Sequence, residues 1–248
     1  VVGIGPERGV DEKGVHSQIW QQLLEFDCIL DETWAKWSLC LKEEGRIKAP
    51  ILCWTHAPLA TMYGSLPPVE KPCFVCISQD QANNFEALYG REARVCYNGI
   101  DLDHYKSLGI PRTNRFLFLA RFSSIKGPDI ALSACKEVGA SLDLIGDTSI
   151  TQEPEYFKQC GALCDGTQLK MIGPASRGET VWWYSQAHVM LHPNQRFREP
   201  FGLAPVEAMA CGCPVIGWKF GALKETIVHG KTGWLVSSYE EFKGTGNM

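Results

Sequence analysis

From residue 113 onward, short apolar runs alternate with amphipathic stretches of helix length. Strand-sized runs separated by helices of about ten residues are typical of βαβ units with a parallel sheet. The runs are continuously apolar, as expected for strands that are covered on both faces. The pattern therefore predicts a Rossmann-like α/β domain over 113–248. The predicted strands are FLFLA (116–120), SLDLIG (141–146), LKMIG (169–173), HVMLHP (188–193), PVIGW (214–218) and WLV (234–236), and the predicted helices lie within 128–138, 154–164, 179–186, 203–211 and 222–230.

Residues 1–112 follow the same pattern less regularly and predict a second, shortened Rossmann-like domain. At most four strands can be counted, which is few for a complete doubly wound sheet. The segment 110–115, which contains Pro111, is the best candidate for a linker between the two domains. The predicted strands are CILDE (28–32), ILCWTH (51–56), CFVCIS (73–78) and RVCYNGID (94–101), with helices over 34–45 and 79–90.

Composition and charge exclude several classes of protein. The 248 residues are 45% hydrophobic and 21% charged, with a formal net charge of -4, so neither a disordered chain nor a broad electrostatic nucleic-acid surface is expected. No apolar run approaches the ~20 residues of a membrane-spanning helix. The opening VVGIGPERGV has no Met and no leader pattern. We expect that the natural N-terminus, or a segment before this one, is absent from the sequence.

Eleven cysteines raise the question of a metal site or a disulfide framework. Cys73 and Cys76 are spaced as C-x2-C, but no second pair at the spacing of a structural zinc site follows them. Both also fall in an apolar, strand-like run. We interpret the cysteines as reduced thiols that serve as small core residues, which fits the cytosol, and we expect no metal.

Two carboxylates stand out in the segment that follows the fourth strand of the regular half. Glu199 is expected in the strand-to-helix loop, and Glu207 about one turn into the helix that starts near Gly202. Both then lie at the carboxyl end of a parallel sheet, where ligands bind in open α/β folds. The amides of 201–203 are donors suited to a phosphate, and Pro205 fits only the first helical turn. Amides for phosphate and carboxylates for hydroxyls together describe a nucleotide-sugar site.

Two cations follow the first strand of the same half. Arg121 and Lys126 would face the same sheet edge as the two carboxylates, and a guanidinium with an ammonium suits a diphosphate. Alone, such residues are more often surface charges, and the two carboxylates could be solvated charges at a helix start. His192, at the end of a strand, is interpreted as structural, and Trp182, Trp183 and Tyr184 as core or interface residues.

The sequence resembles the retaining family-4 glycosyltransferases of the GT-B fold. The resemblance nearly covers the second half and is looser in the first. It implies two Rossmann-like domains with parallel sheets that face each other across a cleft. The motifs that carry it are ARFSSIKGPDIAL (120–132), EPFGLAPVE (199–207), EAMACGCPVIG (207–217), ETIVHGKTGWLV (225–236) and NGID (98–101), with WTHAP (54–58) and VCISQDQ (75–81) in support.

Residue roles follow from this resemblance. Glu199 matches the glutamate that contacts the donor sugar, and Glu207 the one that holds the ribose hydroxyls. Arg121 and Lys126 match the pair that binds the diphosphate. His56 matches a histidine that lies close to the donor sugar and, with Glu199, Arg121 and Lys126, belongs to the expected catalytic set. The amide cradle of the family corresponds here to Phe201, Gly202 and Leu203.

The family's reaction sets the functional expectation. It transfers a sugar from a nucleoside diphosphate sugar to an acceptor, with retention at the anomeric carbon and usually without metal. We expect a UDP-sugar donor, with a GDP-sugar next, and no further cofactor. The acceptor is an unidentified sugar, lipid or small molecule. A cytoplasmic enzyme is expected; peripheral membrane association and homo-oligomerisation are left open.

The sequence also departs from the family. GIGPERG (3–9) is either a remnant of the family's glycine-rich loop or a coincidence, and the chain ends about where a final crossing helix should begin. The acceptor half therefore looks abridged. A nucleotide-sugar-binding protein with little transfer activity is the alternative function. A nicotinamide oxidoreductase is disfavoured because the G-x-G-x-x-G spacing is not met.

Overall fold

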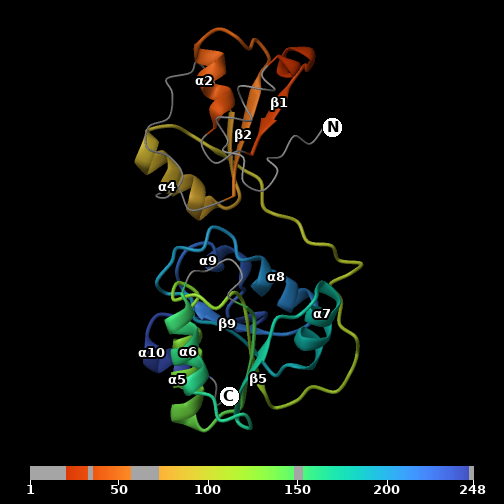
Figure 1. Cartoon of the computed structure of the whole chain (residues 1–248), viewed down its shortest axis with the longest axis vertical. Coiled ribbons are helices and arrows are strands. Elements are labelled where there is room, and N and C mark those ends of the chain that lie inside the picture. Colours follow the sequence, from red (N-terminus) through yellow and green to blue (C-terminus); the bar gives the residue numbers. More distant parts are fainter. Residues whose placement is uncertain (1–20, 33–35, 57–72, 148–152, 246–248) are drawn as a thin grey trace. The chain divides into compact units, whose positions relative to one another are not determined.

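The computed structural model describes residues 21–32, 36–56, 73–147 and 153–245 (Figure 1). The chain divides into two compact units, Val1–Tyr97 and Asn98–Met248, which we call unit 1 and unit 2 and describe separately. The GIGPERG segment and the end of WTHAP lie outside the described residues. Both units are built on parallel sheets, as predicted.

Unit 1 contains a four-stranded parallel sheet with the order β1-β2-β3-β4 among its described residues. Its apolar core includes Leu39 of α2, Phe74 of β3 and Phe85 of α4. Ser78 caps α4 by accepting a hydrogen bond from the backbone N–H of Gln81. The elements are η1 (Gln22–Glu25), β1 (Ile29–Asp31), α2 (Trp37–Glu43), β2 (Ile51–Thr55), β3 (Cys73–Cys76), α4 (Gln79–Tyr89) and β4 (Arg94–Val95).

Unit 2 contains a six-stranded parallel sheet with the order β10-β9-β8-β5-β6-β7. The chain adds strands in one direction from β5 to β7, then returns to place β8 against the other side of β5. This is the strand order of a doubly wound Rossmann sheet. The elements are β5 (Phe116–Leu119), α5 (Pro128–Val138), β6 (Leu142–Ile145), α6 (Pro154–Ala162), β7 (Leu169–Gly173), α7 (Arg177–Gln186), β8 (Met190–His192), α8 (Leu203–Ala210), β9 (Val215–Trp218), α9 (Leu223–Thr226), β10 (Gly233–Val236) and α10 (Tyr239–Thr245).

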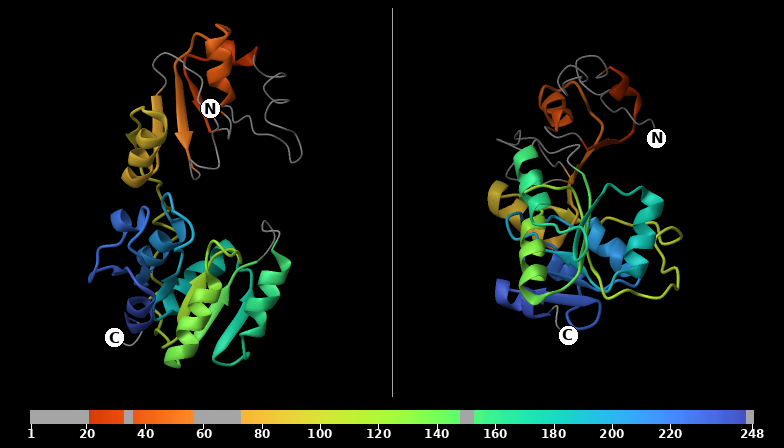
Figure 2. Two further views of the ribbon diagram at one scale, coloured as in Figure 1. Left: turned by 90° about the vertical axis from the view of Figure 1, so that its left-hand side faces the viewer. Right: turned by 60° about the horizontal axis from the view of Figure 1, so that its bottom comes forward.

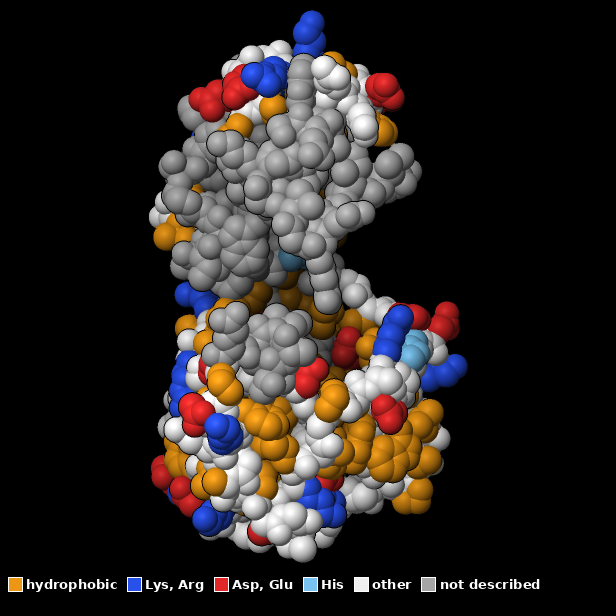
Figure 3. All heavy atoms as spheres, in the orientation of Figure 1, with side chains coloured by type: hydrophobic (Ala, Val, Ile, Leu, Met, Phe, Trp, Pro, Cys, Tyr) orange, Lys and Arg blue, Asp and Glu red, His pale blue; other side chains and the backbone are white. Residues whose placement is uncertain are grey.

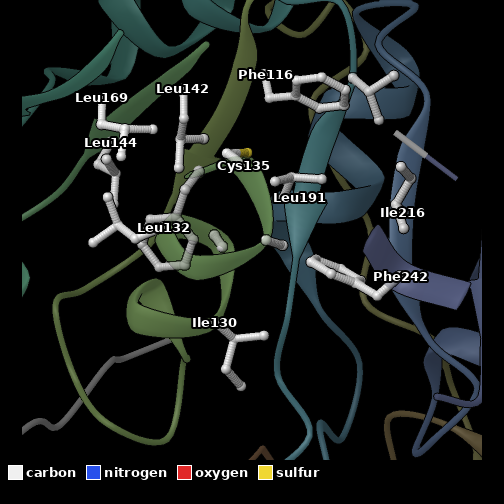
Figure 4. Close-up of a cluster of buried hydrophobic side chains, with 14 of the residues drawn as sticks. Phe116, Ile130, Leu132, Cys135, Leu142, Leu144, Leu169, Leu191, Ile216 and Phe242 are labelled. Atoms are coloured by element: carbon white, nitrogen blue, oxygen red, sulfur yellow. The ribbon is translucent and has the colours of Figure 1, made fainter. Parts of the chain in front are cut away.

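Helices cover both faces of the unit 2 sheet, which explains its continuously apolar strands. Phe116 and Phe118 of β5 pack on the face of α5, α6 and α10, while Leu117 between them packs on the face of α7, α8 and α9. Figure 4 shows Leu132 of α5 and Phe242 of α10 in the first of these clusters, and Figure 2 shows the layers from two further directions. The sheet is therefore a rigid support for the loops at its carboxyl edge.

The boundary between the units lies after Tyr97 rather than after residue 112. Residues 98–112, which we call the connector, pack on unit 2. Tyr105 is buried in the α7–α8 cluster, and Arg112 donates to the carbonyl oxygens of Ala187 and Gly212, both at 2.6 Å. The sequence did not reveal that the connector belongs to unit 2, because the connector forms no helix or strand. Pro111 therefore looked like the middle of a linker.

The cysteines and the surface agree with a globular α/β chain. All eleven cysteines are free thiols, and six are buried. Burial raises the pKa of Cys213 to about 11, which keeps this thiol protonated. Within the described ranges, no helix has the length and apolarity needed to cross a bilayer. On the described part of the face in Figure 3, acidic and basic side chains are interspersed and form no large patch of one sign.

Candidate active site in unit 2

The candidate site lies where the direction of strand addition reverses. β5 and β8 are neighbours in the sheet, and the connections that follow them leave in opposite directions, so the switch point lies at the carboxyl edge between these two strands. Ligands of open α/β folds bind at this switch point. The loop after β5 carries Arg121 and Lys126, and the loop after β8 carries Glu199.

These two loops are in direct contact. Gly127 has φ +70°, and a Cβ at this position would lie 2.8 Å from the carbonyl oxygen of Pro193, so only glycine permits the approach. Arg196 of the second loop donates to Asp129, at the start of α5, with two hydrogen bonds of 2.9 and 2.8 Å. The two contacts bring the backbone next to Lys126 against the loop that carries Glu199.

The Glu199 carboxylate is held through one of its two oxygens. Oε2 accepts from Lys126 Nζ at 2.5 Å and from Asn194 Nδ2 at 2.8 Å, and His192 Nε2 lies 3.7 Å away, beyond hydrogen-bond length. Oε1 has no hydrogen bond to any described residue. Because Lys126 and Asn194 fix the side chain through Oε2, Oε1 is the oxygen available to accept a ligand hydroxyl.

The electrostatics keep Glu199 ionised. Burial alone would raise its pKa, but His192 and Lys126 outweigh burial and lower the pKa to about 2. Lys126 is held as well: its ammonium lies 5.1 Å from the centroid of the Phe197 ring. A charged, oriented hydrogen-bond acceptor therefore sits beside a cation that can pair with a phosphate.

Glu207 lies on α8, close to the predicted place. The helix begins at Leu203 after Gly202, so Glu207 is its fifth residue, and Pro205 falls in the first turn as predicted. The buried hydroxyl of Tyr184 donates to Glu207 Oε2 at 3.3 Å. Glu199 thus lies in the loop that leads into α8, and Glu207 lies near the start of the same helix.

The predicted amide cradle forms the turn into α8. Gly202 adopts φ +87°, which turns the chain between Glu199 and the helix. Within the described chain, the backbone N–H groups of Gly202 and Leu203 have no hydrogen-bond acceptor, as expected for the first turn of a helix. Phe201 is buried and anchors this turn. The turn therefore presents donors to a ligand at the same sheet edge.

The two other residues of the expected set, Arg121 and His56, have surroundings of their own. Arg121 lies at the same sheet edge, but it is exposed and has no hydrogen bond or ion pair to the described residues. His56 follows β2 in unit 1, stacks on Trp54 with 5.7 Å between ring centroids, and has Nε2 3.5 Å from Glu32 Oε1. Its proximity to the donor sugar stays a prediction.

Sequence reasoning missed the residues that hold the two carboxylates. His192 looked like a structural residue, and Asn194 carried no signal because its contact with Glu199 arises from a turn of the loop. Tyr184 of α7 donates to Glu207, and Tyr105 of the connector packs in the same cluster as Tyr184; both tyrosines are distant from Glu207 in sequence. Only the position of His192 and Asn194 at the end of a strand near the switch point could have indicated them.

Unit 2 is a Rossmann-type α/β unit with a largely buried Lys–Glu pair, a second glutamate and the amides of a helix start at its switch point. Comparison with known families makes this class specific. Residues 102–244, more than half of the chain, match the family described as "Glycosyl transferases group 1". The chain belongs to this glycosyltransferase family.

Curated relatives agree with this family. The chain is 30% identical over 136 residues to a D-inositol 3-phosphate glycosyltransferase of Pseudarthrobacter chlorophenolicus, covering 52% of this chain and 32% of that protein. It is 25% identical over 209 residues to D-inositol 3-phosphate glycosyltransferase 2 of Catenulispora acidiphila, covering 74% and 48%. The chain thus spans about a third to a half of the length of these relatives.

Solved structures share the fold. HepE of Anabaena, in complex with UDP and glucose, has a TM-score of 0.76 at 22% identity, with 94% of this chain and 70% of that chain covered. A glycosyltransferase of Rickettsia africae has a TM-score of 0.79 at 16% identity, with 99% and 73% covered. The fold is therefore that of GT-B glycosyltransferases, with two parallel-sheet Rossmann-like units; the predicted cleft between them stays a prediction.

Proposed function

We propose that the protein transfers a sugar from a UDP-sugar to an acceptor with retention of the anomeric configuration, without metal or a further cofactor. The observation that carries the proposal is the buried Lys126–Glu199 pair at the switch point of unit 2. Supporting it, HepE was solved with UDP-glucose as well as with UDP and glucose. A GDP-sugar is the second choice of donor.

Each side chain has a defined task in this proposal. The diphosphate binds between Lys126, Arg121 and the free amides of Gly202 and Leu203, because cations and helix-start amides both stabilise phosphate charge. Glu199 accepts a sugar hydroxyl through Oε1, and Glu207 accepts the ribose hydroxyls. Lys126 then bears the more negative charge that the diphosphate acquires as the glycosidic bond breaks.

The remaining chemistry is positioning and proton transfer. The leaving diphosphate takes the acceptor proton, so the protein needs no separate strong base, and His56 lies beside the donor sugar. The acceptor is a sugar, a lipid or a small molecule, and the protein works in the cytoplasm. These assignments rest on the family resemblance together with the arrangement of the charged groups in unit 2.

The alternative is a protein that binds the nucleotide sugar but transfers it poorly. Both functions predict nucleotide binding, so only a measurement of the product separates them.

Calorimetric titration with UDP, GDP, ADP and NAD, followed by product analysis with the best donor, tests both functions. We expect UDP to bind most tightly and to stabilise the fold by about 2.7 kcal/mol at a hundredfold excess over Kd. Lys126→Ala should weaken UDP binding, whereas Lys158→Ala, on an exposed lysine of α6, should not. Transfer or donor hydrolysis that disappears in Glu199→Ala supports the enzyme, and UDP binding without product supports the alternative. Equal binding of UDP and NAD would refute both.

A further inference from the structure

Two tyrosines from different parts of unit 2 meet the Glu207 carboxylate. Tyr184 is fully buried on α7, and its hydroxyl donates to Glu207 Oε2 at 3.3 Å. Tyr105 lies in the connector, is 8% exposed, and packs in the same cluster as Tyr184, near enough to Glu207 for the carboxylate charge to raise the pKa of its phenol. The connector, α7 and α8 therefore come together around this carboxylate.

Contacts with the start of α7 hold Tyr105 in place. The guanidinium of Arg177 lies 5.9 Å from the Tyr105 ring centroid and 3.2 Å from Asp101 Oδ2. His104 Nε2 lies 3.1 Å from the carbonyl oxygen of Arg177. Asp101 Oδ1 also accepts the backbone N–H groups of Asp103 and His104, at 3.1 Å each, which fixes the turn. The connector is thus docked on the start of α7, the helix that carries Tyr184.

A phenol hydroxyl is a suitable group to orient a carboxylate that must still bind a ligand. A cation would neutralise Glu207 and compete with incoming hydroxyls, whereas a neutral O–H fixes the rotamer and leaves the charge in place. Burial, followed by the charge of Glu207, raises the pKa of both Tyr105 and Tyr184, so both are protonated donors at neutral pH. Glu207 itself is only partly buried and can accept further hydrogen bonds.

We propose that Tyr105 and Tyr184 are positioning residues that orient Glu207 for the ribose hydroxyls, and that the connector takes part in nucleotide binding through Tyr105. The proposal rests on the proposed function, in which Glu207 contacts the ribose. It adds that the segment immediately following unit 1 shapes the nucleotide site of unit 2.

The test compares UDP with 2′,3′-dideoxy-UDP, which lacks both ribose hydroxyls, in calorimetric titrations of the full chain. Tyr105→Phe and Tyr184→Phe remove only the hydroxyls. We expect each to weaken UDP binding about fivefold, the equivalent of one hydrogen bond, and to leave dideoxy-UDP binding unchanged. The matched control is Tyr239→Phe, which removes a phenol–carboxylate bond to Glu137 between α10 and α5, on the opposite face of the sheet, and should change neither affinity.

The outcomes separate this proposal from the proposed function. Equal weakening of both ligands would show a merely structural role for the tyrosines, and unchanged binding of both would show no role; either result overturns the proposal. If the wild-type chain binds UDP and dideoxy-UDP equally, Glu207 does not contact the ribose and the proposal also fails, while the proposed function survives. If the wild-type chain does not bind UDP, the proposed function itself fails.

Discussion

Replacing Lys126 with methionine tests whether the ion pair with Glu199 is the electrostatic centre of the site. The two side chains are only 14% and 11% exposed, so solvent screens the pair weakly. Methionine keeps most of the lysine's volume but removes the charge and the hydrogen bond of 2.5 Å. Glu199 would then be a buried carboxylate that retains Asn194 and the nearby His192 as polar neighbours.

The size of the effect follows from the pKa of Glu199. Burial opposes ionisation, yet the pKa lies at about 2 against an ordinary value of 4.5. This difference favours the ionised form by about 3 kcal/mol. Because Asn194 still donates in the variant, we expect Lys126→Met to lower the free energy of unfolding by about 2–3 kcal/mol at pH 7, somewhat less than the ~3–5 kcal/mol for breaking a fully buried pair. The melting temperature should fall by about 5–10 °C.

The assay is thermal and urea denaturation followed by circular dichroism. Lys158→Met is the matched control, because this lysine pairs with Glu155 in an exposed position and its loss should change the melting temperature little. The double variant Lys126→Met/Glu199→Gln removes both charges and should lose less stability than the sum of the two single variants. Equal effects of the Lys126 and Lys158 substitutions, or strict additivity in the double variant, would refute the reasoning.

Three further predictions concern the same edge of the sheet. Gly127→Ala should destabilise more than Gly139→Ala, because both glycines have φ near +70° but only Gly127 approaches another backbone; urea titrations that gave equal losses would contradict the tight contact with Pro193. The lowered pKa of Glu199 stabilises the fold above about pH 4.5, and this contribution is lost as the pH falls toward about 2. In acid titrations, the free energy of unfolding of Glu199→Gln should therefore fall less over this pH range than that of the wild-type chain. The same pH dependence in both chains would be evidence against this prediction. Arg196→Ala should raise the KM for the donor more than it lowers kcat, since it loosens the loop of Glu199 through Asp129 rather than the reacting groups; a change in kcat alone would argue otherwise.

The sequence was sufficient for most elements of unit 2 because its local signals agree. The exceptions are α9, which covers only Leu223–Thr226 of the predicted 222–230, and α10, which the pattern did not predict. The helix over 128–138 has Pro128 at its start and Gly139 as its C-cap, and its observed bounds match the predicted ones. The placement of Glu199 in a loop and of Glu207 in the first turns of α8 followed from the same kind of evidence. In unit 1, β4 is shorter than its predicted run because residues 96–101 leave the sheet.

The environment of the site could not be predicted because it depends on contacts between distant segments. Nothing in the pattern around Asn194 indicates that its amide reaches Glu199, and the connector has no periodicity that would place Tyr105 beside α8. The pairing of Lys126 with Glu199 was not indicated by the spacing either, and the joint binding of a diphosphate by Arg121 and Lys126 stays a prediction. Spacing predicts which sheet edge a residue occupies, but packing decides what its side chain contacts.

Hydrogen–deuterium exchange of the chain with and without UDP tests the central claim most directly. We predict that UDP slows exchange in peptides from the loops after β5 and β8 and in the first turn of α8, which carry Lys126, Glu199 and Glu207. Peptides at the amino edge of the same sheet, where Arg115 pairs with Asp143, should be unaffected. Protection at that opposite edge, with none around Lys126 and Glu199 under conditions where UDP binds, would contradict the account.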